Sequence, residues 1–227
     1  MTINALTMLE QILNELAPSK TKLIAVSKTK PNEALMNLYN EGQRRFGENY
    51  VQEIVDKQAT LPTDIEWHFI GHLQSNKVKY IAPFVDMIHS VDSFKLLTEI
   101  NQQAAKNERV IRVLLQFHIA EEDTKFGFDT EGVTEMMDSF ATTPLSNVEI
   151  CGVMGMATFT DNKAQVRREF QVLKKIFDDL SQTYFADRQT FSEISMGMSD
   201  DYLMAIEEGS TMVRIGSLLF GKRSYSS

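Results

Sequence analysis

Short apolar runs alternate with segments of helical spacing along most of the chain, and this alternation limits the possible folds more than any other feature. Strand-like runs lie at about residues 22–28, 44–49, 66–71, 87–92, 112–119, 150–157, 191–196 and 213–220. Helical spacing is found at about residues 32–40, 50–58, 93–106, 132–141, 163–181 and 200–208, and in a shorter segment from residue 75. Strands that alternate with helices in this way pair in parallel.

About eight such units close into a barrel, so the sequence predicts an α/β fold of the (β/α)8 TIM-barrel type. We expect one domain over residues 1–227. A doubly wound open sheet is the alternative, but the chain has no G-x-G-x-x-G turn. The last run reaches residue 220, so the final helix is expected to be missing, and a helix over about residues 3–16 to cover the gap.

Composition and charge exclude several classes of protein. With 227 residues and 43% hydrophobic content, the chain can bury a sizeable core. Its net charge of −8 argues against a nucleic-acid partner, because phosphate binding needs a basic surface. The first residues do not resemble a signal peptide, and no run approaches the ~18 apolar residues of a membrane helix. We therefore expect a cytoplasmic protein without a membrane partner.

The residue types that most often bind metals or act as nucleophiles are few and scattered. The histidines His68, His72, His89 and His118 lack the spacing of metal ligands. The single cysteine, Cys151, stands within an apolar run and is expected to be a core residue. We predict no metal site.

Lys28 stands where the first apolar run ends, and in a barrel the active site lies at the carboxyl ends of the strands. Burial lowers the pKa of a lysine, and such lysines form Schiff bases with carbonyl cofactors. The alternative is a lysine whose stem covers apolar surface while its amine reaches water. Lys30, two residues further on, is expected to be a solvated loop residue.

The ends of the seventh and eighth runs are suited to an anion, because phosphate groups in barrels often bind there. Gly197 and Gly216 would let backbone N–H groups approach an anion closely. Hydroxyl groups are available from Ser195, Ser199 and Ser217. Asp200 and Asp201 would repel a phosphate, so we expect it to sit toward the loops rather than on the following helix.

Several of these segments carry a family resemblance. The motifs are residues 25–31 (Ala-Val-Ser-Lys-Thr-Lys-Pro), 46–53 (Phe-Gly-Glu-Asn-Tyr-Val-Gln-Glu), 67–74 (Trp-His-Phe-Ile-Gly-His-Leu-Gln), 195–201 (Ser-Met-Gly-Met-Ser-Asp-Asp) and 213–217 (Val-Arg-Ile-Gly-Ser). In this order they resemble the pyridoxal phosphate homeostasis protein family, from about residue 22 to the C-terminus. Residues 125–127 (Lys-Phe-Gly) depart from a pattern in which many relatives carry a small residue at the middle position.

The resemblance implies a single barrel similar to the N-terminal domain of alanine racemase. It implies pyridoxal 5′-phosphate bound covalently to Lys28 as an aldimine, with Arg214 at the nitrogen of the pyridine ring. By motif position, the other cofactor-binding residues would be Asn49, Ser195, Met198, Ser199, Gly216 and Ser217.

The expected role is that of a cofactor carrier in intracellular pyridoxal phosphate homeostasis, with no catalytic residue. A guanidinium only donates hydrogen bonds, so Arg214 would leave the ring a weak electron sink. Racemisation also needs a second base, which in alanine racemase comes from a second domain and a partner subunit. This chain ends soon after Phe220, so we expect neither, and Tyr50, Tyr80 and Tyr225 are candidates in name only.

Two other functions stay open from the residues themselves. One is a racemase-like enzyme that uses pyridoxal phosphate. The other is a barrel enzyme that acts on a phosphorylated metabolite without this cofactor. We expect a monomer, and its protein partners would be apoenzymes that use pyridoxal phosphate or enzymes of vitamin B6 metabolism.

Overall fold

The computed structural model describes residues 5–121, 127–143 and 145–221. Its strands are β1 (Lys22–Val26), β2 (Arg45–Glu48), β3 (Glu66–Phe69), β4 (Met87–Val91), β5 (Ile111–Gln116), β6 (Val148–Met154), β7 (Glu193–Ser195) and β8 (Met212–Ile215). They form a closed barrel in chain order, and each strand is parallel to its neighbours. The predicted (β/α)8 barrel is therefore confirmed, and the open-sheet alternative is wrong.

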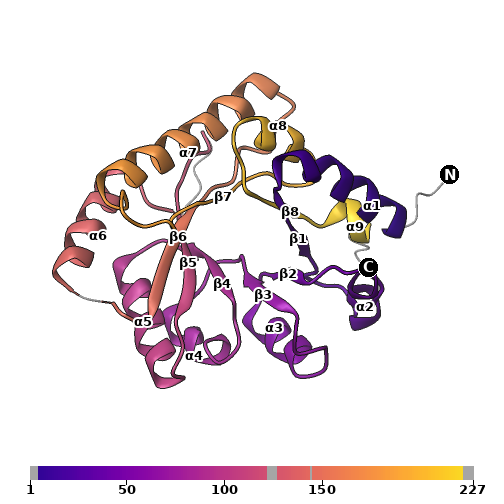
Figure 1. Cartoon of the computed structure of the whole chain (residues 1–227), viewed down its shortest axis with the longest axis horizontal. Helices are drawn as coiled ribbons and strands as arrows, with labels where there is room; N and C mark the ends of the chain where they lie inside the picture. Colours follow the sequence, from indigo (N-terminus) through magenta and orange to yellow (C-terminus); the bar gives the residue numbers. More distant parts are fainter. Residues whose placement is uncertain (1–4, 122–126, 144, 222–227) are drawn as a thin grey trace.

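Helices surround the barrel on the outside (Figure 1). They are α1 (Ala5–Leu16), α2 (Asn32–Asn40), α3 (Val51–Gln58), α4 (Val78–Ile81), α5 (Phe94–Lys106), α6 (Thr130–Thr142), α7 (Lys163–Thr183), α8 (Tyr202–Glu207) and α9 (Ser217–Phe220). Two 3-10 turns, η1 (Ala17–Ser19) and η2 (Ser75–Lys77), precede β1 and α4. None of the described helices is long and apolar enough to cross a membrane.

The end of the barrel differs from the prediction. The last strand was expected to reach residue 220, but β8 stops at Ile215 and the next residues form the one-turn helix α9. The amides of Leu219 and Phe220 donate to the carbonyl of Gly216, which closes this turn. Helix α1 lies beside α9 in Figure 1, so an N-terminal helix covers this part of the barrel as expected. The final helix is short rather than missing.

Several strands are also shorter than their apolar runs. Residues 117–119 and 155–157 were expected in strands, but β5 ends at Gln116 and β6 at Met154. Apolar residues past a strand end still find buried sites under the loops, so hydrophobicity alone does not mark the last paired residue. Met156, in the residues past the end of β6, is exposed, whereas Met154 and Met196 are buried.

Two apolar clusters hold the fold together. The larger one fills the space between the outer faces of the strands and the helices. The smaller one consists of Ile24, Met87, Leu114, Cys151, Met154 and Met212. Cys151 is buried, and burial raises the pKa of its thiol to about 12, so it acts as a core residue as expected.

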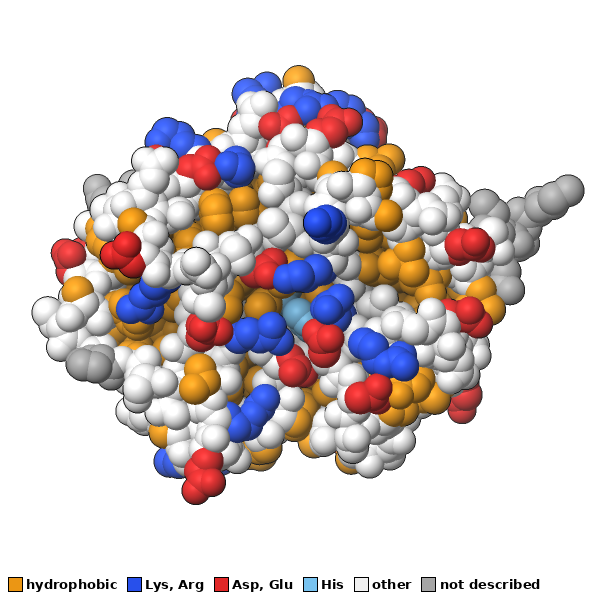
Figure 2. All heavy atoms as spheres, viewed as in Figure 1, with side chains coloured by type: hydrophobic (Ala, Val, Ile, Leu, Met, Phe, Trp, Pro, Cys, Tyr) orange, Lys and Arg blue, Asp and Glu red, His pale blue; other side chains and the backbone are white. Residues whose placement is uncertain are grey.

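Charged side chains close the end of the barrel at which the strands begin. Lys22 at the start of β1 pairs with Glu193 at the start of β7, and Arg45 pairs with Glu66 at 3.0 Å. Figure 2 shows basic and acidic side chains gathered around a histidine near the centre of this face. Lys28 and Ser195, two of the predicted site residues, lie toward the opposite end, where the strands finish.

Gly152 is the residue at which the barrel tolerates a side chain least. Its φ is +153°, and an added Cβ would lie 1.8 Å from the carbonyl oxygen of Glu193 in the next strand. Gly152→Ala is expected to lower the free energy of unfolding by about 3 kcal/mol, since the β6–β7 pairing must open. Urea unfolding measures this loss. Gly42→Ala is the control, with φ +94° and nothing within 4 Å, and should cost only about 1 kcal/mol.

Candidate functional site

Lys28 lies just past the carboxyl end of β1 and is half-buried. The turn that carries it is tight, because the amide of Lys30 donates to the carbonyl of Ser27 at 3.0 Å. Thr29 adopts a φ of +64°, which a residue with a branched side chain rarely adopts. The lysine therefore stands on a constrained turn at the mouth of the barrel rather than on a loose loop.

Ser195 and Arg214, predicted from separate motifs, are in direct contact. Nη1 of Arg214 in β8 donates to Oγ of Ser195 at the end of β7, at 2.6 Å. Nη2 of Arg214 donates to the carbonyl of Gly155 at 3.1 Å. Both side chains are buried, and within the described part of the chain Arg214 forms no ion pair with a carboxylate.

Two histidines extend this contact into the barrel. Oγ of Ser195 lies 3.0 Å from Nδ1 of His89, and Nε2 of His89 lies 2.8 Å from Nδ1 of His68. Both rings are buried in the barrel, which is one of the roles expected for them from the sequence. A chain of hydrogen bonds therefore runs from His68 through His89 and Ser195 to Arg214.

Burial determines the charge state of the titratable side chains in this series of hydrogen bonds. It lowers the pKa of His68 to about 3, with help from the positive charges of Arg112 and Arg45. It also lowers the pKa of His89 well below its usual value. Burial lowers the pKa of Arg214 to about 10, which still leaves the guanidinium charged at neutral pH. This series of hydrogen-bonded side chains thus contains one buried cation, Arg214, and otherwise neutral groups.

The depressed pKa of His68 predicts a loss of stability in acid. The unfolded chain takes up the His68 proton near pH 6.5, whereas the folded protein does so only near pH 3. This contribution is complete above pH 6.5 and is lost as the pH falls toward 3, at up to about 1.4 kcal/mol per pH unit. Urea unfolding at several pH values should show a smaller loss for His68→Asn than for the unmodified protein. Equal losses in the two proteins would contradict the prediction.

Two of the remaining predicted residues, one after the seventh strand and one after the eighth, line the same cavity. Met198 and Ser217 line a space of about 560 Å³, together with Thr158 and Lys163 at the start of α7. Ser199 lies in the loop after β7 and is half-buried.

Gly216 links this cavity to the lysine. An added Cβ at Gly216 would lie 3.1 Å from the carbonyl oxygen of Val26, the last residue of β1. The loop after β8 therefore lies against the strand that leads to Lys28, and the predicted phosphate residues adjoin the predicted Schiff-base residue.

Two details of the expected anion cradle differ. The amide of Met198 donates to Oδ1 of Asp201 at 2.5 Å, so the carboxylate occupies an N–H group that an anion would need. Burial raises the pKa of Asp201, opposed by this bond. Gly197 has a φ of +94°, and an added Cβ would lie 2.6 Å from Cβ of Ala205 in α8. This glycine is required by helix packing, whatever its role toward a ligand.

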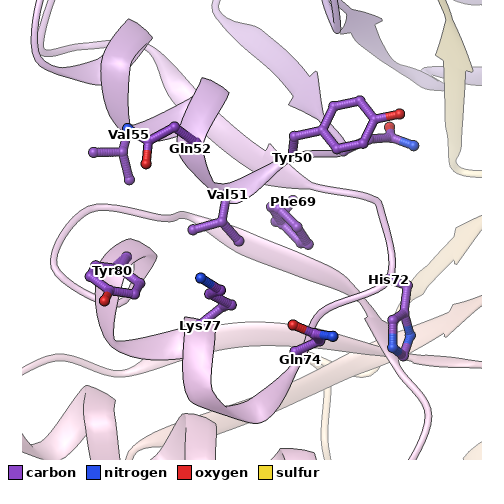
Figure 3. Close-up of a pocket in the computed structure, with 10 residues that line it drawn as sticks. Tyr50, Val51, Gln52, Val55, Phe69, His72, Gln74, Lys77 and Tyr80 are labelled. Atoms are coloured by element: carbon purple, nitrogen blue, oxygen red, sulfur yellow. The ribbon is translucent and has the colours of Figure 1, made fainter.

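Asn49 follows β2 directly and lines a groove of about 550 Å³ beside the mouth. Figure 3 shows Val51 of α3 facing Lys77 and Tyr80 across this groove. The side-chain oxygen of Asn49 is buried without a hydrogen-bond partner among the described residues. A buried oxygen of this kind is costly to leave unpaired, so it is suited to a donor group of a ligand.

These residues fit a phosphorylated aromatic aldehyde. Lys28 supplies an amine, and Arg214 supplies a buried donor whose hydrogen bonds go to Ser195 and Gly155, with the charge of Asp201 nearby. The cavity at Met198 and Ser217 lies at the place where barrels bind phosphate, and Lys163 is the one cation among its described lining residues, beside the carboxylates of Asp161, Asp200 and Asp201. Residues 125 and 126, which carry the departure from the family motif, lie outside the described residues, as does Tyr225.

Comparisons with known proteins identify the family of the chain. The family model described as alanine racemase, N-terminal domain, matches residues 4–224. A curated relative from Aquifex aeolicus, named pyridoxal phosphate homeostasis protein, is 43% identical over 205 residues, which cover 90% of this chain and 88% of the relative. The chain belongs to the pyridoxal phosphate homeostasis protein family. A relative of the same name from Escherichia coli K12 is 38% identical over 217 residues, covering 92% of this chain and 89% of the relative.

Solved structures place the family on a known fold. PipY of Synechococcus elongatus, in a structure with pyridoxal phosphate bound, aligns with a TM-score of 0.85 and 35% identity, covering 96% of this chain and all of that one (100%). Alanine racemase of Clostridium difficile aligns with a TM-score of 0.76 and 16% identity, covering 98% of this chain and 58% of the racemase. The second likeness shows the fold alone.

Sequence reasoning missed several residues in and around the candidate site. His89 was not placed next to Ser195, and the buried pair of Glu48 and Lys57 was not anticipated. A signal was present for Glu48, since an acidic residue at the end of an apolar strand needs a partner. No sequence pattern identified that partner as Lys57.

Proposed function

We propose that this protein holds pyridoxal 5′-phosphate as a Schiff base on Lys28 and acts as a carrier in pyridoxal phosphate homeostasis, as one domain over residues 1–227. The amine of Lys28 condenses with the aldehyde carbon, a C=N bond forms and one water is released. Hydrolysis returns the free aldehyde, so capture is reversible. The observation that carries the proposal is a lysine on a constrained turn at a barrel mouth, next to the loop after β8.

The surroundings of Arg214 favour holding over catalysis. Bound pyridoxal phosphate supplies an electron sink when its ring nitrogen is protonated, which a carboxylate partner promotes. The group proposed to face that nitrogen here is a guanidinium, held by neutral acceptors from Ser195 and Gly155. It donates a hydrogen bond and leaves the nitrogen unprotonated. We therefore propose that amino acids are not turned over at a useful rate.

A racemase-like enzyme is the second candidate, favoured by the likeness of the fold to alanine racemase. Two of the tyrosines considered as a second base are described. Tyr50 is 55% exposed beside the mouth, and Tyr80 is 48% exposed on α4. Neither is held in place by burial. Incubation of the loaded protein with single L-amino acids separates the candidates, because formation of D-isomer or keto acid would favour the enzyme.

Borohydride reduction tests the carrier function. The protein is mixed with pyridoxal 5′-phosphate, reduced, digested and mapped by mass spectrometry. We expect the reduced adduct on the peptide that contains Lys28. An adduct on another lysine would overturn the assignment, and a colourless protein without any adduct would instead support a barrel enzyme for a phosphorylated metabolite.

A further inference from the structure

Two side chains of α3 hold the backbone on both sides of Lys28. Nζ of Lys57 donates to the carbonyl oxygen of Ser27 at 2.8 Å. The amide of Thr29 donates to Oε1 of Glu53 at 2.6 Å. Lys57 and Glu53 are paired with each other at 2.7 Å, one helical turn apart. The backbone groups of Ser27 and Thr29, on either side of Lys28, are thus held by the same ion pair.

Glu48 of β2 ties this pair to the barrel. Its Oε1 accepts from Nζ of Lys57 at 2.7 Å and from the hydroxyl of Ser27 at 2.6 Å. An ammonium has three N–H donors, and Lys57 makes bonds to three acceptors. Glu48 is fully buried and Lys57 is 5% exposed. The ammonium is therefore fixed from three sides, and its position dictates that of the Ser27 carbonyl.

The turn needs such a hold. The left-handed backbone of Thr29 costs about 1–3 kcal/mol, and such strain persists only where surrounding contacts enforce it. A buried ion pair is also a poor way to gain stability, because apolar side chains of similar volume do as well or better. The position that these three charged side chains impose on the Lys28 turn therefore explains the network better than a gain in stability does.

We infer that Glu48, Glu53 and Lys57 are positioning residues that hold the Lys28 turn in the conformation in which its amine meets an aldehyde. The inference rests on the proposed function and names the residues that make Lys28 fit for it. None of the three needs to touch the ligand.

The test compares variants by their rate of Schiff-base formation with pyridoxal 5′-phosphate, followed by absorbance and confirmed by borohydride trapping at Lys28. Glu53→Ala should slow capture about ten-fold or more, because small misplacements of a reacting group are costly. Glu53→Gln keeps an acceptor for the Thr29 amide and should restore most of the rate. Asp56→Ala removes a carboxylate from the same helix that bonds only Gln52 among the contacts described, and should react at the unmodified rate.

A second variant separates positioning from stability. Glu48→Met combined with Lys57→Met replaces the buried ion pair with apolar side chains of similar length, so the protein should stay folded while capture slows by the same ten-fold. Hydrogen exchange at the Thr29 amide gives a readout without the ligand, and it should speed up in Glu53→Ala about as much as capture slows.

Capture at the unmodified rate in both Glu53→Ala and the folded double variant would overturn the inference. The proposed function fails separately, when the unmodified protein itself carries no adduct on Lys28.

Discussion

Replacing Lys28 with alanine is expected to abolish covalent capture of pyridoxal 5′-phosphate. The C=N bond needs a primary amine, and the variant has none at the end of β1. Absorbance should show only the free aldehyde after mixing, and reduction with borohydride should leave no adduct on the peptide that spans residue 28. The fold should survive, because Lys28 is only half-buried on a turn outside the sheet.

Lys30 provides the matched control for this prediction. It lies on the same turn, but its Nζ donates to the carbonyls of Phe220 and Gly221 at 2.9 and 3.4 Å. Lys30→Ala should keep the adduct on Lys28, although loss of the contacts with Phe220 and Gly221 should slow capture modestly. A protein without Lys28 that still forms a stable adduct on Lys30 would contradict the assignment.

Lys57→Met is expected to cause the largest loss of stability among the charged residues discussed. Removal of one partner from a buried pair leaves the other charge uncompensated, which costs about 3–5 kcal/mol. Here the remaining carboxylate is Glu48, whose second oxygen is already buried without a partner in the described chain. Urea unfolding at pH 7 measures the loss.

The pH dependence and a surface pair provide controls for the Lys57→Met loss. Burial already raises the pKa of Glu48, and loss of Lys57 removes the main opposing influence. The folded variant should therefore take up a proton more readily than the unfolded chain, and its deficit should shrink as the pH falls from 7 toward 5. Lys175→Met breaks an exposed pair with Asp179 and should cost at most about 1 kcal/mol. If Lys57→Met lost as little stability as Lys175→Met, Glu48 would have to be solvated or otherwise paired in the variant.

The order of elements was predictable because hydrophobic periodicity is a local property. Two helix starts illustrate this. Pro31 directly precedes α2, and the hydroxyl of Ser93 caps α5 by accepting from the amide of Leu96, so each signal acts on residues that are close in the sequence. The end of β8 was predicted wrongly, since residues 217–220 are as apolar as a strand yet follow a glycine that starts a turn. Periodicity reports which residues avoid water, but pairing decides where a strand stops.

The candidate site likewise has features that were predictable from the sequence and features that were not. The sequence by itself determined that Lys28 lies close to the end of a strand, and parallel strands with short links bring strand ends to one face. Only the tertiary structure decided that Arg214 contacts Ser195 and that His89 and His68 continue this contact. It alone also decided that Lys57 donates a hydrogen bond to the Ser27 carbonyl. These partners lie on different strands and helices, and a shift of one residue in register would turn each side chain to the other face of the barrel wall. Contacts of this kind depend on the closed barrel as a whole, so no single segment of the sequence encodes them.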